Sequence, residues 1–394
     1  MRFPEFSDEW KTKKLGEIAT FSKGKGISKS DVEEPGITEC IRYGELYTHY
    51  GAIIDEVKSK TNVDISDLVL SESNDVIIPA SGETTIDIAT ASCVLKSGIA
   101  LGSDLNIIKT ENNGVFLSYY LNSKKKMEIA NLAQGISVVH LYSSQLASLS
   151  LSLPKFGEQN KISSFLSLLD KRIQTQNKII KELSVVKITL AKNIFSQRLR
   201  FKDQNNNQFS NWEKKKLGEL GEIINGLTYS PKDINSKGIL VLRSSNIQNR
   251  SLAFNDNVYV NTKKYNPVKE NDILICVRNG SKNLIGKNAL ICKDNEGLAF
   301  GAFMSVYRSP YNKFIFQWFD TDEYREIVNR NLGATINSIN GSDLKKILIH
   351  FPSLHEQTKI ADFLEAVGSK IEIEIQLLRE LEKQKKFLLH NMFI

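Results

Sequence analysis

The stretch LPKFGEQNKISSFL, residues Leu153–Leu166, returns as FPSLHEQTKIADFL at Phe351–Leu364. The two stretches share Pro, Glu, Gln, Lys, Ile, Phe and Leu, seven of fourteen positions, at an offset of 198 residues. In each, a proline closes a short apolar strand pattern, and an acidic residue then opens a run that favours helix. The chain therefore encodes the same strand end and helix start twice.

The repetition extends over the whole chain. KKLGEI at Lys13–Ile18 matches KKLGEL at Lys215–Leu220, and NIF at Asn193–Phe195 matches NMF at Asn391–Phe393. The polar insertion DQNNNQ shifts the offset from 198 to 202 near the start of the second copy. A match kept in phase over this length indicates one duplicated unit of about 198 residues. Similarity is weak in the middle of each copy, as expected where loops on a common framework have diverged.

A long helix is predicted at the end of each copy. Each run continues for about 40 residues without proline, which corresponds to a helix of about 60 Å. Apolar side chains recur with a period of 3.5 over five heptads, the pattern of a coiled coil. The seam residues selected by this period are Leu166, Leu169, Ile173, Ile180 and Leu183 in the first helix, and Leu364, Val367, Ile371, Leu378 and Leu381 in the second.

The polar breaks in the seam recur as well, Gln176 with Glu374 and Lys187 with Lys385. Polar seam residues fix the register of a coiled coil at some cost in stability. We expect the two helices to pair with each other in antiparallel; a four-helix bundle or a coil between two copies is the alternative. The predicted fold class is α+β: two tandem-duplicated α/β domains joined by two long antiparallel coiled-coil helices, a pseudo-two-fold dumbbell.

Composition narrows the functional classes. Hydrophobic residues make up 41% of the chain and charged residues 25%, as in ordinary soluble globular proteins. We expect a cytoplasmic protein without a membrane partner, because there is no apolar run of 18 residues and no signal-peptide pattern at the start. Scattered cysteines and histidines predict no metal site. The net charge of +7 permits a polyanionic partner. Residues 1–153, however, hold 15 Lys and Arg against 20 Asp and Glu, so DNA contact there would need local patches.

The duplicated motifs resemble those of a type I restriction-modification specificity subunit (HsdS), over essentially the full length. The resemblance rests on the W..KKLGE openings, the strand end R-x-[GS]-[DEN]-[IL], the glycine segments GIS and GAT, and above all P-x-x-x-E-Q-x-x-I-x-x-F-L, present twice. It implies two target recognition domains, residues 1–153 and 199–351, each reading one half of a bipartite site in double-stranded DNA. It also implies two conserved spacer helices, 154–198 and 352–394, which set the half-site separation and dock two methyltransferase (HsdM) subunits. Restriction and translocase (HsdR) subunits would join through the complex.

Arg42 and Arg243, at equivalent strand ends, are the first candidates for DNA contact, because arginine binds guanine bidentately and also binds phosphate. The alternative is a surface arginine that pairs with Glu45 or caps a turn. The loop VRNGSKN at Val277–Asn283 offers further donors, and its polar counterpart PASGETT at Pro79–Thr85 has no Lys or Arg.

Two further segments complete the candidate set. The Lys-Gly stretch at Phe21–Ser30 either contacts phosphate or is a solvated loop. Polar residues after Gly135 and Gly333 either read a groove or cap helices. The full set is Lys23, Lys25, Arg42, Tyr43, Ser81, Thr84, Ser137 and His140 in the first copy, and Arg243, Asn246, Arg278, Asn279, Lys282, Thr335 and Asn337 in the second.

No catalytic role is expected for the chain alone. All eight prolines are isolated, which excludes the [DNS]PP[YFW] element of amino-methyltransferases. GSKNLIGKN at Gly280–Asn288 lacks the spacing and the Ser or Thr of a phosphate loop. We therefore expect no cofactor here, with S-adenosylmethionine and ATP on partner subunits. The alternatives are a non-catalytic decoy adaptor that titrates modification subunits, and a two-headed protein scaffold without salt-dependent DNA affinity.

Overall fold

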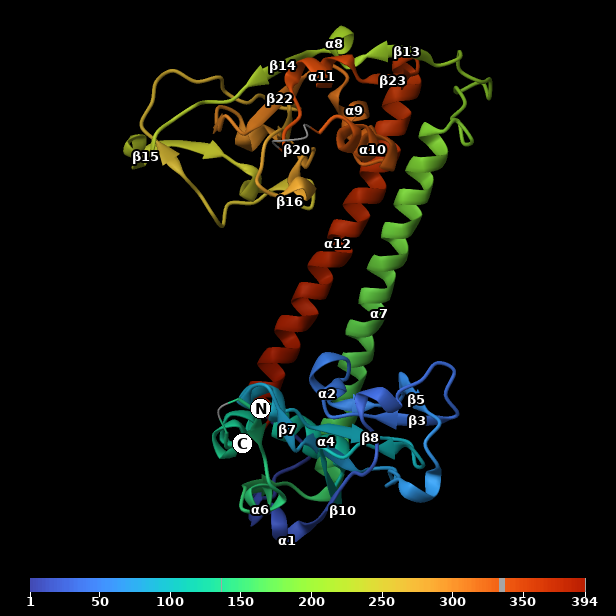
Figure 1. The fold of residues 1–394 in the computed structure, drawn as a ribbon, viewed down its shortest axis with the longest axis vertical. Coiled ribbons are helices and arrows are strands. Elements are labelled where there is room, and N and C mark those ends of the chain that lie inside the picture. Colours follow the sequence, from blue (N-terminus) through green and yellow to red (C-terminus); the bar gives the residue numbers. More distant parts are fainter. Residues whose placement is uncertain (136, 333–336, 394) are drawn as a thin grey trace. The chain divides into compact units, whose positions relative to one another are not determined.

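The fold is given by a computed structural model that describes residues 1–135, 137–332 and 337–393. The chain divides into two compact units, one of Met1–Lys178 with Gln376–Ile394 and one of Ile179–Ile375. Each unit holds one globular region and a part of both long helices, α7 and α12 (Figure 1). We call residues 1–153 region 1 and residues 199–351 region 2.

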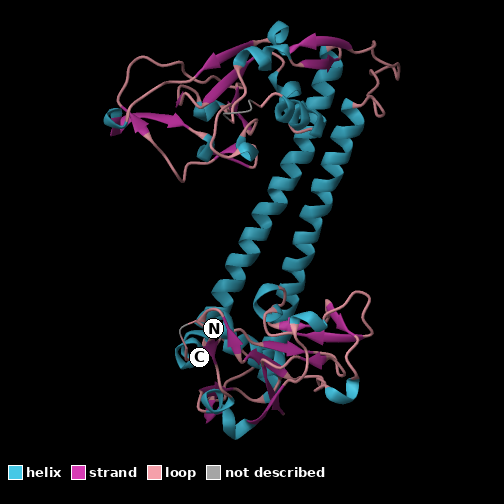
Figure 2. Cartoon of the chain, viewed as in Figure 1, coloured by secondary structure: helices cyan, strands magenta, loops and turns pink. Residues whose placement is uncertain are grey.

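The two helices predicted from the heptads are α7 (Phe156–Phe195), with 40 residues, and α12 (Leu354–Met392), with 39 residues (Figure 2). All ten predicted seam residues are buried or half-buried. In the first unit, Leu166 near the start of α7 belongs to the same core as Leu388 near the end of α12. In the second, Ile194 near the end of α7 shares a core with Ile360 near the start of α12. Within each unit the helix segments therefore pack in opposite directions.

Region 1 is built on a central five-stranded sheet and a smaller three-stranded sheet. The central order is β2 (Ala19–Lys23), β10 (Leu105–Thr110), β6 (Val76–Pro79), β8 (Ser92–Val94) and β4 (Ile53–Ile54). The smaller sheet has the order β5 (Ser59–Thr61), β3 (Thr38–Ile41) and β9 (Ala100–Leu101), with β3 and β9 parallel. Two-stranded sheets join β1 (Lys11–Lys14) to β12 (Ser150–Leu153) and β7 (Ser81–Gly82) to β11 (Val139–His140). The short helices are α1 (Leu15–Ile18), α2 (Glu45–Thr48), α3 (Thr85–Ile88), α4 (Gly114–Ser123), α5 (Lys126–Leu132) and α6 (Ser143–Ala147).

Region 2 repeats this framework, including the part where the two sequences barely match. Its main sheet has the order β14 (Glu222–Asn225), β22 (Met304–Arg308), β19 (Ile273–Cys276) and β20 (Asn288–Leu290). The smaller one has the order β18 (Tyr259–Val260), β15 (Ile234–Leu242) and β21 (Ala299–Phe300), with β15 and β21 again parallel. Two-stranded sheets join β13 (Glu213–Lys216) to β23 (Leu348–Phe351) and β16 (Ile247–Gln248) to β17 (Ser251–Leu252). The helices are α8 (Leu217–Leu220), α9 (Asn312–Trp318), α10 (Asp322–Arg330) and α11 (Gly341–Lys346). Four strands of the main sheet and the three strands of the smaller sheet therefore keep the same order in both regions, whereas the main sheet of region 2, as described, has no strand in the place of β4.

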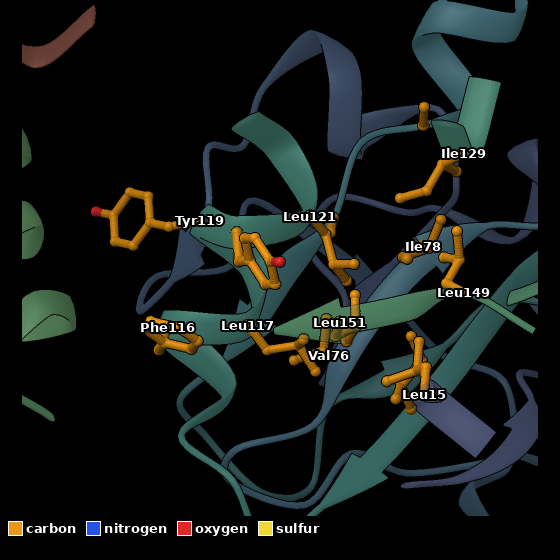
Figure 3. Packing of buried hydrophobic residues seen from close by; sticks show 14 of the residues in the cluster. Leu15, Val76, Ile78, Phe116, Leu117, Tyr119, Leu121, Ile129, Leu149 and Leu151 are labelled. Atoms are coloured by element: carbon orange, nitrogen blue, oxygen red, sulfur yellow. The ribbon is translucent and has the colours of Figure 1, made fainter. Parts of the chain in front are cut away.

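The core of region 1 lies between the main sheet and α4. Val76 and Ile78 of β6 belong to one buried cluster with Phe116, Leu117 and Tyr119 of α4, and the Tyr119 ring lies at the outer side of the labelled group (Figure 3). The Tyr119 hydroxyl donates to the Asp170 carboxylate on α7 at 2.6 Å. Burial and the neighbouring carboxylate raise the pKa of Tyr119, so this hydroxyl remains a donor. The contact fastens region 1 to α7.

The polar seam lysines make different contacts in the two copies. Lys385 on α12 pairs with Asp170 on α7, with 2.5 Å between Nζ and Oδ1. The repeat position that corresponds to Asp170 is Gly368, so the equivalent lysine, Lys187, has no such acid opposite it. Lys187 instead pairs with Asp320 of region 2, at 3.2 Å.

The repeated Glu-Gln pair begins each long helix and makes the same bonds twice. Glu158 and Glu356 lie in the first helical turn, as the sequence predicts, and both are buried. The side-chain amide of Gln159 donates to the carbonyl oxygen of Pro154 at 3.0 Å, and Gln357 donates likewise to Pro352 at 2.6 Å. The glutamine thus closes the turn that follows the proline, which explains why this spacing recurs.

Candidate nucleic-acid interface

Arg243 follows β15 and is held by its own loop. Its backbone N–H donates to Asn246 Oδ1 at 2.9 Å, and its Nη2 donates to the Asp256 carbonyl oxygen at 3.1 Å. Nη2 also lies 2.8 Å from the Asp256 carboxylate. Nε is buried and has no hydrogen-bond partner among the described residues. The guanidinium is therefore oriented by one acid, while 32% of the side chain stays exposed.

Asn246, predicted beside Arg243, lies inside the fold. Its side-chain amide donates to the carbonyl oxygens of Ala253 and Asp256 at 3.0 and 3.3 Å, and the residue is fully buried. Asn246 therefore holds the loop that presents Arg243, and Arg243 is the accessible member of the pair.

Three segments that are distant in sequence meet beside Arg243. Asn279 donates from its side chain to Ser244 Oγ at 3.0 Å and from its backbone to the Asn337 carbonyl oxygen at 3.2 Å. Asn337 in turn donates to the carbonyl oxygen of Gly280 at 3.0 Å. Arg278 and Lys282 are exposed on the same loop. The structure thus brings together five of the candidates in region 2: Arg243, Arg278, Asn279, Lys282 and Asn337. Thr335 lies outside the described residues.

A groove of about 530 Å³ opens next to this junction, with Arg243, Asp256, Tyr229 and Phe303 in its lining. Phe303, on the turn between β21 and β22, is 57% exposed. The Arg278 guanidinium carbon lies 5.7 Å from the centre of its ring. Sequence reasoning missed Tyr229 and Phe303, because nothing in the local pattern separates an exposed aromatic residue from a core one.

Arg42 in region 1 is tied to a buried acid. Its backbone N–H donates to Glu45 Oε2 at 2.8 Å, and its Nη2 lies 3.6 Å from Oε1. The expected alternative, a pair with Glu45, is therefore present, although 26% of the Arg42 side chain remains exposed. Its Nε is buried without a hydrogen-bond partner among the described residues, as in Arg243. Tyr43, the next residue, is half-buried.

The other candidates of region 1 lie on two neighbouring strands and a cap. Ser81 on β7 pairs with His140 on β11; Ser81 is nearly buried and His140 is exposed. Ser137 is exposed just before β11. Thr84 caps α3, because its Oγ1 accepts from the Asp87 backbone N–H at 3.1 Å.

Lys23 and Lys25 are exposed on either side of Gly24, at the end of β2. A Cβ on Gly24 would lie 2.0 Å from the carbonyl oxygen of Gly102, and one on Gly226 would lie 2.1 Å from that of Gly301. The repeated glycine is therefore required for a close approach of two backbone segments within each region. The two lysines remain candidates for phosphate contact.

The equivalent loops of the two regions differ in charge. Tyr47 lies among Tyr43, Glu83 and Asp87; burial raises the pKa of Tyr47, and these three neighbours raise it further. Carboxylates therefore stand near the 79–85 loop of region 1. Region 2 has Arg278 and Lys282 in its corresponding loop. The two equivalent loops therefore present opposite charges to whatever binds there.

Within the described ranges, no group of three or more His, Cys, Asp and Glu side chains is placed to hold a metal ion. A separate search of the same residues finds no helix with the length and apolar character needed to cross a bilayer.

Comparison with known proteins agrees with the duplicated architecture. The chain matches the family described as "Type I restriction modification DNA specificity domain" over residues 7–185 and again over 209–383. It is 24% identical to the type I restriction enzyme MjaVIII specificity subunit of Methanocaldococcus jannaschii, over 99% of this chain and 92% of that protein. It is 28% identical to the EcoKI specificity subunit of Escherichia coli, over 41% of this chain and 37% of that protein. The crystal structure of a type I restriction-modification S subunit from M. genitalium superposes with a TM-score of 0.62 at 15% identity, over 98% of this chain and 96% of that one. The chain therefore belongs to the family of type I restriction-modification specificity subunits, with one DNA specificity domain in each repeat.

Proposed function

We propose that this chain addresses a type I restriction-modification complex to an asymmetric, bipartite site in double-stranded DNA. Residues 1–153 and 199–351 act as target recognition domains, and each binds one half-site. The observation that carries this proposal is the repeated strand order with different exposed side chains at equivalent loops. A shared framework with two unlike surfaces suits the recognition of two unlike sequences.

DNA contact in region 2 centres on Arg243, Arg278, Asn279 and Lys282. Arginine and asparagine can make paired hydrogen bonds to guanine and adenine, and lysine can neutralise phosphate. In region 1 the exposed candidates are Lys23, Lys25, Thr84, Ser137 and His140, and Arg42 is half-buried. The lysines position the duplex, and the short polar side chains face the bases.

The segments 154–198 and 352–394 act as spacer helices and as docking surfaces for two methyltransferase subunits. Both helices expose apolar side chains despite their buried seams: Leu168, Ile179, Val185, Val186, Ile188, Ile373, Leu377 and Phe387. A methyltransferase subunit that docks along the helices would cover these side chains. Restriction and translocase subunits join through the same complex.

Catalysis belongs to those partners in this proposal. Methylation of adenine within a duplex requires the base to leave the stack and enter a pocket of the enzyme. S-adenosylmethionine and ATP are therefore bound by partner subunits, and this chain supplies recognition only.

The test is a methylation map. The chain is co-expressed with the methyltransferase encoded beside it in a host without modification, and methylated adenines are located by long-read sequencing. We expect one bipartite motif, two short unlike halves around an unspecific gap. A one-part motif would show that only one region reads DNA. A stable complex without methylation would instead favour the decoy adaptor.

The scaffold alternative is tested by binding alone. A protein that contacts six or more phosphates loses DNA affinity by roughly a thousandfold between 50 and 200 mM salt. The purified complex should show this loss, whereas a protein scaffold would show no salt-dependent affinity for DNA.

A further inference from the structure

One turn occupies the same place in both regions and carries opposite chemistry. In region 2, Cys276 of β19 pairs with Met304 of β22, and the residue before Met304 is Phe303. In region 1, Pro79 of β6 pairs with Leu105 of β10, and the residue before Leu105 is Asp104. The strands are equivalent in the two sheets, so Phe303 and Asp104 occupy equivalent positions.

Backbone hydrogen bonds confirm this equivalence. The N–H of Val277 donates to the Phe303 carbonyl oxygen at 3.0 Å, and the N–H of Ala80 donates to the Asp104 carbonyl oxygen at 2.7 Å. The next residues along these strands are Arg278 and Ser81, which therefore also correspond. Each region thus presents a two-residue tip: 278 with 303 in region 2, and 81 with 104 in region 1.

The tip of region 2 is apolar and cationic. The Phe303 ring projects from a turn that its own backbone fixes, because its carbonyl oxygen also accepts from the N–H of Arg278 at 3.1 Å. The Arg278 guanidinium lies over this ring, within the range of a cation–π contact. Both side chains are exposed beside the groove that contains Arg243.

The tip of region 1 has neither a ring nor a cation. Asp104 is exposed, and Ser81 is almost covered. The neighbouring Ser103 is used within the fold, since its Oγ accepts from the Gly26 N–H at 3.0 Å. The exposed carboxylate of Asp104 is therefore the group that this tip offers.

We propose that these tips are specificity-determining elements, and this inference rests on the proposed DNA-reading function. Phe303 makes an apolar contact with the 5-methyl group of a thymine, and Arg278 donates to the O6 and N7 of an adjacent guanine. Asp104 accepts a hydrogen bond from the N4 amino group of a cytosine. Each of these pairings follows from the groups that base pairs display in the major groove.

Fold stability does not explain Phe303. Its backbone bonds are independent of the side chain, and its ring is mostly in water, where an apolar surface gains nothing unless a partner covers it. A phosphate contact does not explain it either, because an aromatic ring cannot neutralise charge. A base edge with a methyl group fits both the ring and the guanidinium beside it.

The experiment is selection of bound fragments from a random DNA library by the purified complex with its methyltransferase. Phe303→Ala should make one position of the region 2 half-site degenerate, with discrimination at that position reduced about tenfold. Arg278→Ser should relax the adjacent position. Asp104→Asn should relax one position of the other half-site only. In each case the unaltered half-site and the gap are internal controls.

Leu348→Ala is the matched control, because Leu348 is also an exposed apolar residue of region 2 but lies on β23. It should leave the selected motif unchanged, and thermal unfolding should show all variants folded. An unchanged motif for Phe303→Ala, or a uniform loss of affinity with no position relaxed, would overturn the inference. A wild-type complex that selects no bipartite motif would instead overturn the proposed function itself.

Discussion

Arg200 and Glu356 form a two-pronged ion pair, in which Nε and Nη2 donate to the two carboxylate oxygens at 3.1 and 2.8 Å. The indole of Trp212 donates to the same carboxylate at 2.9 Å. Arg2, Trp10 and Glu158 make the equivalent contacts in the other unit. In each repeat, an arginine, a tryptophan and a glutamate that are far apart in sequence therefore form one contact, which joins the start of the region to the start of its helix.

Removing the charge of Glu356 should destabilise the second unit strongly. The carboxylate is fully buried, and a Gln there would leave the mostly covered Arg200 without its counter-charge. We expect Glu356→Gln to lower the free energy of unfolding by about 3 kcal/mol, measured by urea denaturation. Glu365→Gln, at an exposed site on the same helix, is the control and should change it by less than about 0.5 kcal/mol.

The same change in the other unit should have a smaller effect. Arg2 is more exposed than Arg200, and the Trp10 bond to Glu158 is longer, at 3.3 Å. We therefore expect Glu158→Gln to lower the free energy of unfolding by less than Glu356→Gln does in the same denaturation experiment. Equal or reversed losses would show that these exposures do not govern the strength of the pair.

Asp320 should make the stability of region 2 depend on pH. Burial raises the pKa of Asp320, but the charges of Arg250, Lys187 and Arg325 outweigh burial and hold that pKa below its ordinary value. A carboxyl group with a lowered folded-state pKa stabilises the fold above its unfolded pKa, and this contribution is lost as pH falls through the folded value. Asp320→Asn should thus lower the free energy of unfolding by about 2–4 kcal/mol at pH 7. The difference from wild type should shrink as the pH falls below about 4.

Unfolding of wild type and Asp320→Asn between pH 3 and pH 7 measures this difference. Asp322→Asn is the control, because Asp322 is exposed and pairs only at the surface with Arg325. A gap between wild type and Asp320→Asn that stays constant over the whole range would contradict the assignment of the pKa shift to Asp320.

Gly226 should tolerate no side chain. A Cβ there would meet the carbonyl oxygen of Gly301 at 2.1 Å. Gly226 directly follows β14 and Gly301 directly follows β21, so neither segment can move away without disturbing a sheet. We expect Gly226→Ala to cost about 3 kcal/mol, seen as a lower midpoint of thermal unfolding. Gly280→Ala is the control, because a Cβ at Gly280 would meet open space. A neutral Gly226→Ala would mean that the two turns can separate.

Lengthening both helices should change only the gap of the DNA motif. Seven residues inserted after Gln176 and seven after Glu374 keep the 3.5 period and add about 10 Å to each helix. At 3.4 Å per base pair, the gap in the methylation map should grow by about three base pairs. Seven residues inserted into the polar loop at Asp203–Gln208 should leave it unchanged. Altered half-sites at a constant gap would contradict the spacer role.

The features that could be predicted from the sequence are those that repeat at a regular spacing. The duplication, the helices and their seam follow from residues that repeat at 198 or 3.5 positions, and all ten seam residues are covered in the structure. The loop of Arg278 and Asn279 could be selected because polar residues follow a strand. Its position beside Arg243 was not predictable, since sheet pairing brings these segments together.

Other features depend on distant contacts and had no local signal. Glu356 looks like a helix-dipole residue until Arg200, 156 positions away, is placed against it. Asn246 looks like a polar surface residue, but backbone carbonyls of its own loop enclose its amide. From the sequence alone Phe303 would be assigned to the core, because a phenylalanine is usually buried. Its exposure is set by the direction in which the turn faces, which only the folded structure shows.

The unequal partners of Lys385 and Lys187 determine what would happen if one region were replaced by a different sequence. Asp170, the acid that neutralises Lys385, belongs to α7 and remains when region 1 is exchanged. Asp320, the acid that neutralises Lys187, belongs to region 2 and is lost with it. An incoming segment in the second half must therefore supply its own acid at this position, or it leaves an ammonium group unpaired beside the helix. Exchange of the first half carries no such condition, so the two halves of the recognition sequence are not equally free to evolve.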